Sequence, residues 1–398
     1  MAYTSKKRKF SFNGGFLLNR NFWLFAWVLT AVAAFVLKFR QGEGGYNNYV
    51  IFKNVFFNFR AENSLYAPQP EIYNDLNHYG PFFALIIAPF ALLPDWMGMF
   101  LWLMLGTLLF YFAIRALPIE PKWQAATYLI SALMLYNALA MQQFNVYTAA
   151  LLILSFVMVE QRREGWAALF IVLGTFVKIY GIVGLAFFFF VKRKPRFLLY
   201  ILIWSVVAFL LPMAFTSPSY ILEQYSEWLR QLEIKTIQNQ LSYYQNISLL
   251  GMVRKISGTL QYSDMWIMLA GAFMFVIPYL RISQYKRINF RLMFLASALI
   301  MTVLFSSGSE NSGYNIAVAG VGIWLGATPA RRGFVTWALI ALVMIASFAY
   351  NLVPVWIYKD YFFQYSLKAL PFALVWLRIC YELYFLDFYH RTNSYYLV

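Results

Sequence analysis

Long apolar segments recur from one end of this chain to the other, and they constrain its fold more than any other feature. The 398-residue sequence is 62% hydrophobic and only 12% charged, whereas about a quarter of the residues in a soluble domain are charged. Most of the segments approach the length that a helix needs to cross a bilayer. We therefore expect an all-α integral membrane protein, with residues 1–398 forming a single polytopic membrane domain.

Composition also excludes several classes of function. Cys380 is the only cysteine, and the two histidines, His78 and His390, lie far apart in the sequence, so we expect no disulfide framework, no metal and no cofactor. The net charge of +16 lies in short basic clusters between apolar segments, as the positive-inside rule describes. We therefore expect membrane lipids as partners and no nucleic acid. The sequence has no Walker motif and no Rossmann glycine pattern, which argues against ATP-driven transport.

Charge and length together predict a topology of about twelve crossings. The run KKRK at 6–9 precedes an apolar run without a convincing cleavage site, so we expect a signal anchor with its N-terminus in the cytoplasm. Twelve crossings then place both chain ends in the cytoplasm. The predicted crossings are 21–38, 97–115, 123–141, 146–159, 166–177, 179–191, 197–214, 265–281, 290–306, 314–328, 334–351 and 371–387.

Two choices determine this count. We treat 166–191 as a hairpin with Lys178 at its tip, although each arm is short for a hydrocarbon core of about 30 Å. We also exclude 80–94, because its length and its three prolines fit a re-entrant or interfacial helix better. Reversing both choices gives another even count, but it moves four basic residues to the outside. Both topologies remain open on the sequence alone.

Three outer segments, 39–96, 215–264 and 352–370, are too long to be simple turns. The first contains an amphipathic pattern with Asn54, Asn58 and Arg60 on its polar face, and the second contains another with Tyr225 and Trp228. We therefore expect periplasmic loops with interfacial helices at 39–96 and 215–264. Long loops over a rigid bundle commonly carry function.

Lys178 is the only charged residue between Glu164 and Lys192. A lysine at bilayer depth costs at least about 2.5–3.5 kcal/mol, so an anionic partner or a wet cavity is expected around it. Short polar runs recur on the same predicted side of the bundle, which favours a site there. These runs are 74–83, 141–145, 176–181, 243–255 and 305–317.

Several motifs occur in order along most of the chain. The first outer loop reads NNYVIFK and then SLY, followed by HYGPFFALIIAPFALLP. Further along stand Gln142-Gln143-Phe144-Asn145, then QRREGW through FVK, and then Asn246-Ile247-Ser248-Leu249. In their order and spacing these motifs resemble glycosyltransferase family 87, within the GT-C superfamily, where the three later stretches correspond to Gly-Gln-Val-Asn, a short hairpin with a lysine, and Asn-Gln-Ser-Leu.

The resemblance implies a GT-C-like bundle in a bacterial inner membrane, with the active site on the periplasmic face. It implies transfer of a hexose, typically mannose, from a polyprenyl-phosphate donor to a glycan or glycolipid acceptor. The family often places an aspartate where this chain has Asn48, preceded by Asn47. Since an amide cannot act as a general base, we expect Asp75 or Glu310 in that role, with Glu43 as a third candidate.

The remaining candidates divide between the donor phosphate and the sugars. Lys178 and His78 are expected to contact the phosphate, because a lysine acts as a point charge toward it. Substrate contacts are expected from Asn48, Tyr79, Gln143, Asn145 and Asn246. Structural alternatives are open for each: Lys178 could extend to lipid headgroups, Asp75 could cap a helix, and the amides could satisfy backbone groups. Arg378 and Glu382 are expected to form a structural pair one turn apart.

Two other functions compete with the enzyme. A transporter or flippase of a lipid-linked glycan would be expected to have inverted repeats, and the sequence contains no convincing repeat. A non-catalytic relative that only binds a polyprenyl lipid would be consistent with the amides at Asn47 and Asn48.

Overall fold

The computed structural model describes residues 14–389 except 241, 243, 260 and 262. The predicted basic run at 6–9 and the basic residue Arg391 therefore lie outside the described residues. Within the described part of the chain, all regular secondary structure is helical, which confirms the predicted all-α class. The elements at the predicted crossings are α1 (Arg20–Phe39), α4 (Asp95–Arg115), α5 (Pro121–Ala140), α6 (Asn145–Glu160), α7 (Glu164–Val177), η3 (Ile179–Phe190), α8 (Lys194–Leu210), α11 (Met265–Val276), α12 (Ile288–Leu304), α13 (Tyr314–Ala327), α14 (Phe334–Leu352) and α16 (Ala369–Phe385).

In the described part of the chain, three helical segments are long and apolar enough to cross a membrane by length and composition, namely Arg20–Phe39, Asp95–Arg115 and Lys194–Ala214. Several shorter apolar helices accompany them. Helices of this kind indicate a membrane protein, while the count of about twelve crossings stays a prediction.

The remaining elements are α2 (Asn47–Arg60), α3 (Phe83–Ala91), α9 (Pro218–Asn239), α10 (Leu249–Ser257), α15 (Val355–Ile357), the π-helical η8 (Tyr358–Phe363), and the short η1 (Gly14–Leu18), η2 (Glu43–Gly45), η4 (Leu211–Ala214), η5 (Ile277–Leu280), η6 (Ile282–Lys286) and η7 (Asn311–Gly313).

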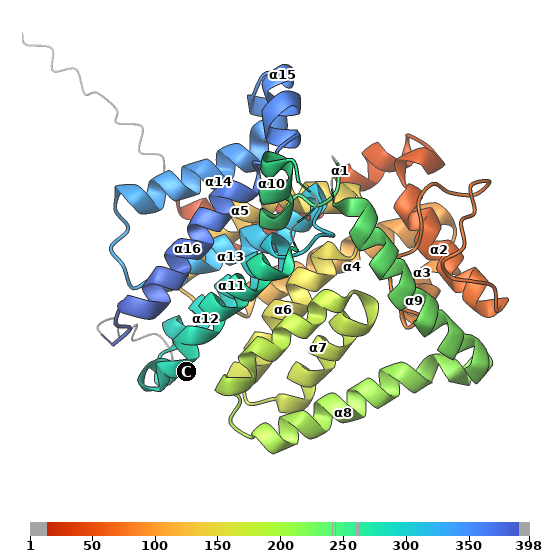
Figure 1. Cartoon of the computed structure of the whole chain (residues 1–398), viewed down its shortest axis with the longest axis horizontal. Helices are drawn as coiled ribbons and strands as arrows, with labels where there is room; N and C mark the ends of the chain where they lie inside the picture. The colour runs from red at the N-terminus through yellow and green to blue at the C-terminus, as the bar shows by residue number, and fades with distance from the viewer. Residues whose placement is uncertain (1–13, 241, 243, 260, 262, 390–398) are drawn as a thin grey trace, which may run out of the picture.

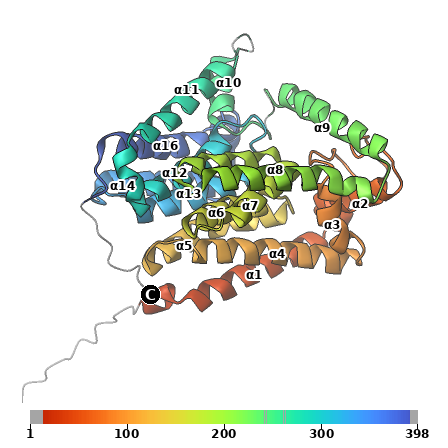
Figure 2. The ribbon, with the colours of Figure 1, turned by 90° about the horizontal axis from the view of Figure 1, so that it is seen from below.

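The bundle is built in layers around α12 and α13 (Figures 1 and 2). Nearly every side chain of α13 is buried, and α12 packs along it. Helices α5 and α6 also pack on this central pair, while α1 and α4 lie farther out (Figure 2). The most deeply buried helices are therefore at the centre of the molecule.

The predicted hairpin around Lys178 is present, but its second arm is a 3₁₀-helix. Gly181, Gly184 and Phe187 are the buried residues of η3, and a 3₁₀-helix places residues three apart on one face. A Cβ atom on Gly181 would lie 2.2 Å from the backbone nitrogen of Thr175, so the glycines allow η3 to pack against α7. At about 2.0 Å per residue, twelve residues reach about 24 Å instead of about 18 Å for an α-helix.

Helices α2, α3 and α9 form a layer beside the bundle (Figure 1). The carboxylate of Glu62 accepts hydrogen bonds from the backbone nitrogen and the hydroxyl of Ser217, both at 2.7 Å, and joins the loop after α2 to the start of α9. Asn58, which was expected on a polar face of α2, is instead buried because the following loop covers it and brings Gln69 to 3.4 Å. In the excluded segment 80–94, α3 has nine residues, about 14 Å of helix.

The structure contains the predicted pair of Arg378 and Glu382, with Nε of the arginine 2.7 Å from the carboxylate. Glu382 is fully buried and also accepts a hydrogen bond from Thr328 at 2.7 Å. Both carboxylate oxygens of Glu382 therefore have partners within the bundle, so this acid is a structural residue.

Candidate active site

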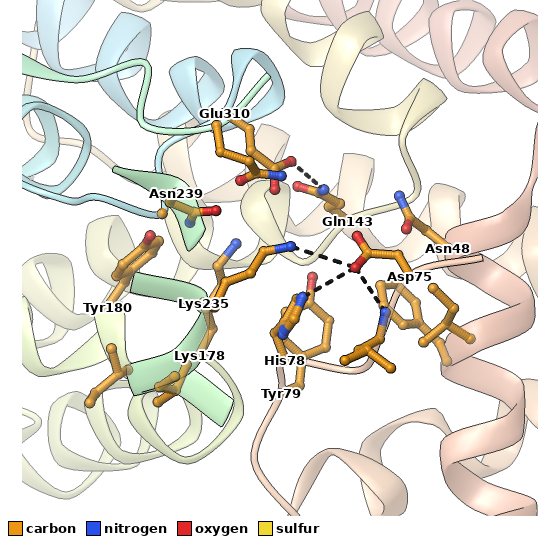
Figure 3. Close-up of a pocket in the computed structure, with 17 residues that line it drawn as sticks. Asn48, Asp75, His78, Tyr79, Gln143, Lys178, Tyr180, Lys235, Asn239 and Glu310 are labelled. Atoms are coloured by element: carbon orange, nitrogen blue, oxygen red, sulfur yellow. Dashed lines mark hydrogen bonds and ion pairs between the residues drawn. The ribbon is translucent and has the colours of Figure 1, made fainter. Parts of the chain in front are cut away.

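A cavity of about 120 Å³ lies where the loops over the bundle converge (Figure 3). We call it the Lys178 cavity. Asn48 comes from α2, Gln143 from the α5–α6 turn, and Glu310 from the loop before η7. Most of the predicted site residues line this cavity, namely Asn48, Asp75, His78, Tyr79, Gln143, Lys178 and Glu310.

A chain of hydrogen bonds joins Lys178 to Glu310. Lys178 Nζ donates to Asn145 Oδ1 at 2.8 Å, and Asn145 Nδ2 donates to Gln143 Oε1 at 2.7 Å. Gln143 Nε2 then donates to Glu310 Oε2 at 2.6 Å. Because an ammonium group only donates, each amide in the chain has one possible orientation. Asn145 therefore holds the lysine without itself lining the cavity.

The backbone before α6 places these two amides. Gln142 has φ of 49°, in the left-handed region that glycine adopts most readily. In the resemblance to family 87, Gln142 corresponds to the glycine of the family's Gly-Gln-Val-Asn stretch. The turn directs Gln143 toward Glu310 and Asn145 toward Lys178, while Ser312 Oγ donates to Gln143 Oε1 at 2.8 Å. Gln143 is thereby held by partners on both sides.

Lys178 lies between α7 and η3 in an extended conformation, with φ of −142° and ψ of 106°. Its amine lies 5.7 Å from the ring centre of Tyr79 and 5.1 Å from that of Tyr180, which is within cation–π range. Among the described residues, no carboxylate forms an ion pair with it. Burial lowers the pKa of Lys178 to about 8, although nearby Glu310 opposes the shift.

Asp75 sits opposite, in the loop before α3. Its φ of 78° is unusual for a residue with a side chain. Oδ1 accepts a hydrogen bond from the backbone nitrogen of Leu76 at 2.9 Å and lies 3.6 Å from His78 Nε2 and 3.5 Å from Lys235 Nζ (Figure 3). Burial alone would raise the pKa of Asp75, but His78 and Lys235 outweigh it and lower the pKa to about 2. Asp75 is therefore a weakly basic carboxylate.

The loop that carries His78 is fixed against the lysine hairpin. Gly80 donates its backbone N–H to the carbonyl of Val177 at 3.0 Å. A Cβ atom on Gly80 would lie 2.2 Å from the carbonyl oxygen of Phe176, so only glycine allows this approach. Trp228 of α9 also donates to the carbonyl of His78 at 3.0 Å. His78 and Lys178 are thus held side by side by backbone contacts.

Asn47 and Asn48 both have structural partners. The Asn47 side chain pairs with the backbone of Asn74, donating to its oxygen at 2.6 Å and accepting from its nitrogen at 2.8 Å. Asn48 Nδ2 donates to the carbonyl of Met141 at 2.8 Å. An aspartate at 48 could not make this last bond, because a carboxylate has no donor. The amide of Asn48 therefore joins α2 to the α5–α6 turn by a hydrogen bond that requires a donor.

Asn246 does not line the Lys178 cavity, although its chain neighbour Gln245 does. It is fully buried, with φ of 53°. Its Oδ1 accepts from Ser248 Oγ at 2.7 Å, and the neighbouring Ile247 N–H donates to the carbonyl of Ser309 at 2.8 Å. The Asn246 side chain is therefore bonded within its own loop, and the backbone of Ile247 joins that loop to the one that carries Glu310.

Sequence reasoning missed Tyr180, Lys235 and Asn239, which also line the cavity. Lys235 and Asn239 are four residues apart on α9 and therefore share one helix face. Their spacing in the sequence could have indicated a shared polar face, but the same spacing occurs on any solvent-exposed helix face. Tyr180 is tied to Ser306 by a 2.6 Å contact between their hydroxyl oxygens.

The cavity thus combines two carboxylates, Asp75 and Glu310, with Lys178, Lys235 and His78. Such an arrangement can bind a phosphate ester and accept a proton from a hydroxyl group. The described residues contain no group of three or more His, Cys, Asp or Glu side chains that could hold a metal ion.

The sequence also matches a family of known proteins. A family model described as glycosyltransferase family 87 matches residues 77–307. The matched range includes Lys178 and the Gln143–Asn145 turn, and it ends three residues before Glu310. A search of curated proteins found no match to this chain.

Proposed function

The chain belongs to glycosyltransferase family 87, and we propose that it transfers a hexose, with mannose as the expected sugar, from a polyprenyl-phosphate donor. The acceptor is a hydroxyl group on a lipid-linked or periplasmic glycan, and the reaction takes place at the outer face of a bacterial inner membrane. The observation that carries this proposal is the chain of hydrogen bonds from Lys178 to Glu310, which holds a cation and a carboxylate at one cavity.

In this proposal Lys178 binds the donor phosphate. A lysine surrounded by protein, held by an amide and two aromatic rings but by no acid, has a charge that an anionic ligand would compensate. Lys235 and His78 approach the same space (Figure 3). Asp75 fixes these two groups through Oδ1, and it is a positioning residue in this account.

Glu310 is the proposed general base. Asp75 suits this role less well, because the hydrogen bond from His78 and the charge of Lys235 lower its pKa to about 2 and so weaken it as a proton acceptor. Glu310 is held through Oε2 by Gln143, which leaves Oε1 for the hydroxyl group of the acceptor. The base would have to lie within about 2.6–3.2 Å of that hydroxyl.

The charges explain why the lysine would accelerate the reaction. The acceptor oxygen forms a bond to the anomeric carbon, the bond from that carbon to the phosphate oxygen breaks, and the hydroxyl proton moves to Glu310. The phosphodiester carries one negative charge and leaves as a phosphate monoester with a second one. A fixed ammonium group is therefore bound more strongly in the transition state than in the ground state.

A purified-enzyme assay tests the proposal. Radiolabelled polyprenyl-phosphate-mannose and a lipid extract of the host would be given to wild type, Glu310→Gln, Asp75→Asn and Lys178→Ala. We expect label transfer by wild type and almost none by Glu310→Gln or Lys178→Ala. Label that crosses a sealed vesicle without being transferred would favour a flippase, and lipid binding without transfer from any donor would favour a non-catalytic relative.

A further inference from the structure

A second and larger cavity lies next to the Lys178 cavity. Its volume of about 600 Å³ falls within the range of roughly 300–1,000 Å³ that is typical of small-molecule sites. We call it the Lys368 cavity. It is lined by the C-terminal ends of α1, α5 and α14, by the loop around Glu310, and by η8. Its lining residues include Lys38, Glu310, Ser347, Phe362, Phe363 and Lys368.

The two cavities share part of their walls. Glu310 and Gln245 line both of them. Glu310 therefore stands between the space beside Lys178 and the space beside Lys368. A general base between two cavities suits a transferase. The base must face the acceptor hydroxyl in one cavity, while the donor phosphate lies in the other, on the far side of the reacting carbon.

Lys368 is a buried cation without an acidic partner. Its side chain is only 8% exposed, and among the described residues no ion pair forms on it. Its amine contacts the side-chain oxygen of Asn311 and the sulfur of Met134, and it lies 4.7 Å from the ring centre of Tyr314. Burial lowers the pKa of Lys368 to about 7, as expected for an ammonium group removed from water.

A second polar group on this cavity lacks a partner. The hydroxyl of Ser347, a residue that is 8% exposed, has no hydrogen-bond partner among the described residues. Lys38 lines the cavity as well, so the described lining contains two lysines and one carboxylate, that of Glu310. The wall therefore carries an excess of positive charge and a free hydroxyl, which together favour an anionic ligand.

Another part of the wall is apolar. Ala346 and Ala349 of α14, with Phe362 and Phe363 of η8, line the cavity. Neighbouring residues of α14 and α15, such as Leu352 and Trp356, are exposed at 65% and 60%. Exposed apolar side chains next to an apolar wall suit a ligand that carries hydrocarbon chains.

From these contacts we infer that the Lys368 cavity binds the acceptor, and that the acceptor is an anionic glycolipid whose phosphate rests on Lys368 while a sugar hydroxyl faces Glu310. The acceptor role rests on the proposed function. The anionic lipid site does not, because binding can be measured without any transfer.

Binding is tested with the full-length protein in nanodiscs of phosphatidylcholine. Native mass spectrometry would count bound phosphatidylglycerol and, in a separate arm, inorganic phosphate. We expect Lys368→Met to bind phosphatidylglycerol about tenfold or more weakly than wild type, since a charged hydrogen bond is lost, and Lys368→Arg to retain most of the binding. The matched control is Lys359→Met, an exposed lysine of the same segment, which should bind as wild type does.

Each outcome decides the inference. Equal binding of phosphatidylglycerol by wild type and Lys368→Met would overturn it, and binding of inorganic phosphate alone would overturn the lipid part. Lys368→Met should fold, because it replaces a buried unpaired charge by an apolar side chain of similar length, and its melting temperature checks this. In the transfer assay it should raise the KM for the acceptor and leave the donor affinity unchanged. Loss of transfer in every variant, with Lys368-dependent binding intact, would reject the proposed function alone.

Discussion

At the scale of single residues, the site depends on how Lys178 is held. Asn145 is its hydrogen-bond partner at 2.8 Å, and Tyr79 and Tyr180 present their rings to it. All three are neutral, so the lysine is positioned without being neutralised. This arrangement leaves its charge for a ligand, and it has a consequence for the pH dependence of activity.

We expect kcat/KM to fall as the pH rises through about 8, the pKa to which burial lowers Lys178. The group is charged below this pH and neutral above it, and kcat/KM reports the free enzyme. The kcat profile should extend to higher pH, because a bound phosphate raises the pKa of the lysine. Initial rates across pH 6–10 measure both profiles.

The variant Lys178→Arg provides the control, since an arginine stays charged over this whole range. Its kcat/KM should no longer fall near pH 8, even if its overall rate is lower. A decline at the same pH in both proteins would assign the titration to another group.

The two carboxylates should give different kinetic results. We expect Glu310→Gln to lower kcat by about 10²–10⁴, the usual contribution of a general base. Asp75→Asn should mainly raise the KM for the donor and change kcat by less than about tenfold, because Asp75 orients Lys235 and His78. Steady-state kinetics on both variants decide the matter, and the reverse pattern would make Asp75 the base.

At this scale the sequence indicated which residues could bind a phosphate or accept a proton, but it did not indicate which of them are hydrogen-bonded to each other. Lys178 stood out because it interrupts an apolar run, and Gln143 and Asn145 stood out through their motif. The link from Gln143 to Glu310 joins residues 167 positions apart, and no local pattern predicts such a pair. Asn246 has a motif as clear as that of Asn145, yet its side chain is used to order a loop.

At the scale of elements, the position of Lys178 depends on how closely η3 packs against α7. The hairpin was predicted from charge and length, whereas the 3₁₀ form of its second arm was not. The spacing of Gly181, Gly184 and Phe187 carries that information, but a period of three over so few residues is rarely decisive. Long 3₁₀-helices are uncommon, so an α-helix was the natural expectation.

The variant Gly181→Ala tests this packing. The new methyl group would lie 2.2 Å from Thr175 N and 2.3 Å from Gly174 C, both backbone atoms, so the two arms would have to separate. We expect a loss of stability of about 1–3 kcal/mol, together with reduced activity because Lys178 would move. Thermal unfolding in detergent and the transfer assay provide the two readouts.

Gly44→Ala is the matched substitution for this experiment, since no atom lies within 4 Å of its added methyl group. It should unfold at the wild-type temperature and keep its activity. If both variants behaved alike, close packing of η3 would not be what places Lys178.

At the scale of the whole molecule, the proposed reaction can take place only if all loops of the site lie on one side of the membrane. The helix ends that line the two cavities are the ones predicted to face outward. The sequence predicted a helical membrane protein and its family, because both depend on patterns along the chain. The Lys368 cavity was not predicted, since it depends on how α1, α5, α14 and η8 converge in space.

Cysteine labelling tests this sidedness. Cys380, the single cysteine, is buried, so it should not react. A cysteine at Glu71, which is exposed in the loop of the site, should react with a membrane-impermeant maleimide from the periplasmic side. A cysteine at Arg193, in the basic turn before α8, should react only after the inner membrane is permeabilised. The opposite result would place the site on the cytoplasmic side.

The most direct test of the central claim is an experimental structure of the full-length protein with a polyprenyl phosphate bound. We predict density for the phosphate in the Lys178 cavity, within hydrogen-bond distance of Lys178 Nζ and on the side of Lys235 and His78, with Glu310 facing the adjoining Lys368 cavity. A phosphate bound at the basic turn 192–196, or in the Lys368 cavity with the Lys178 cavity empty, would contradict the account.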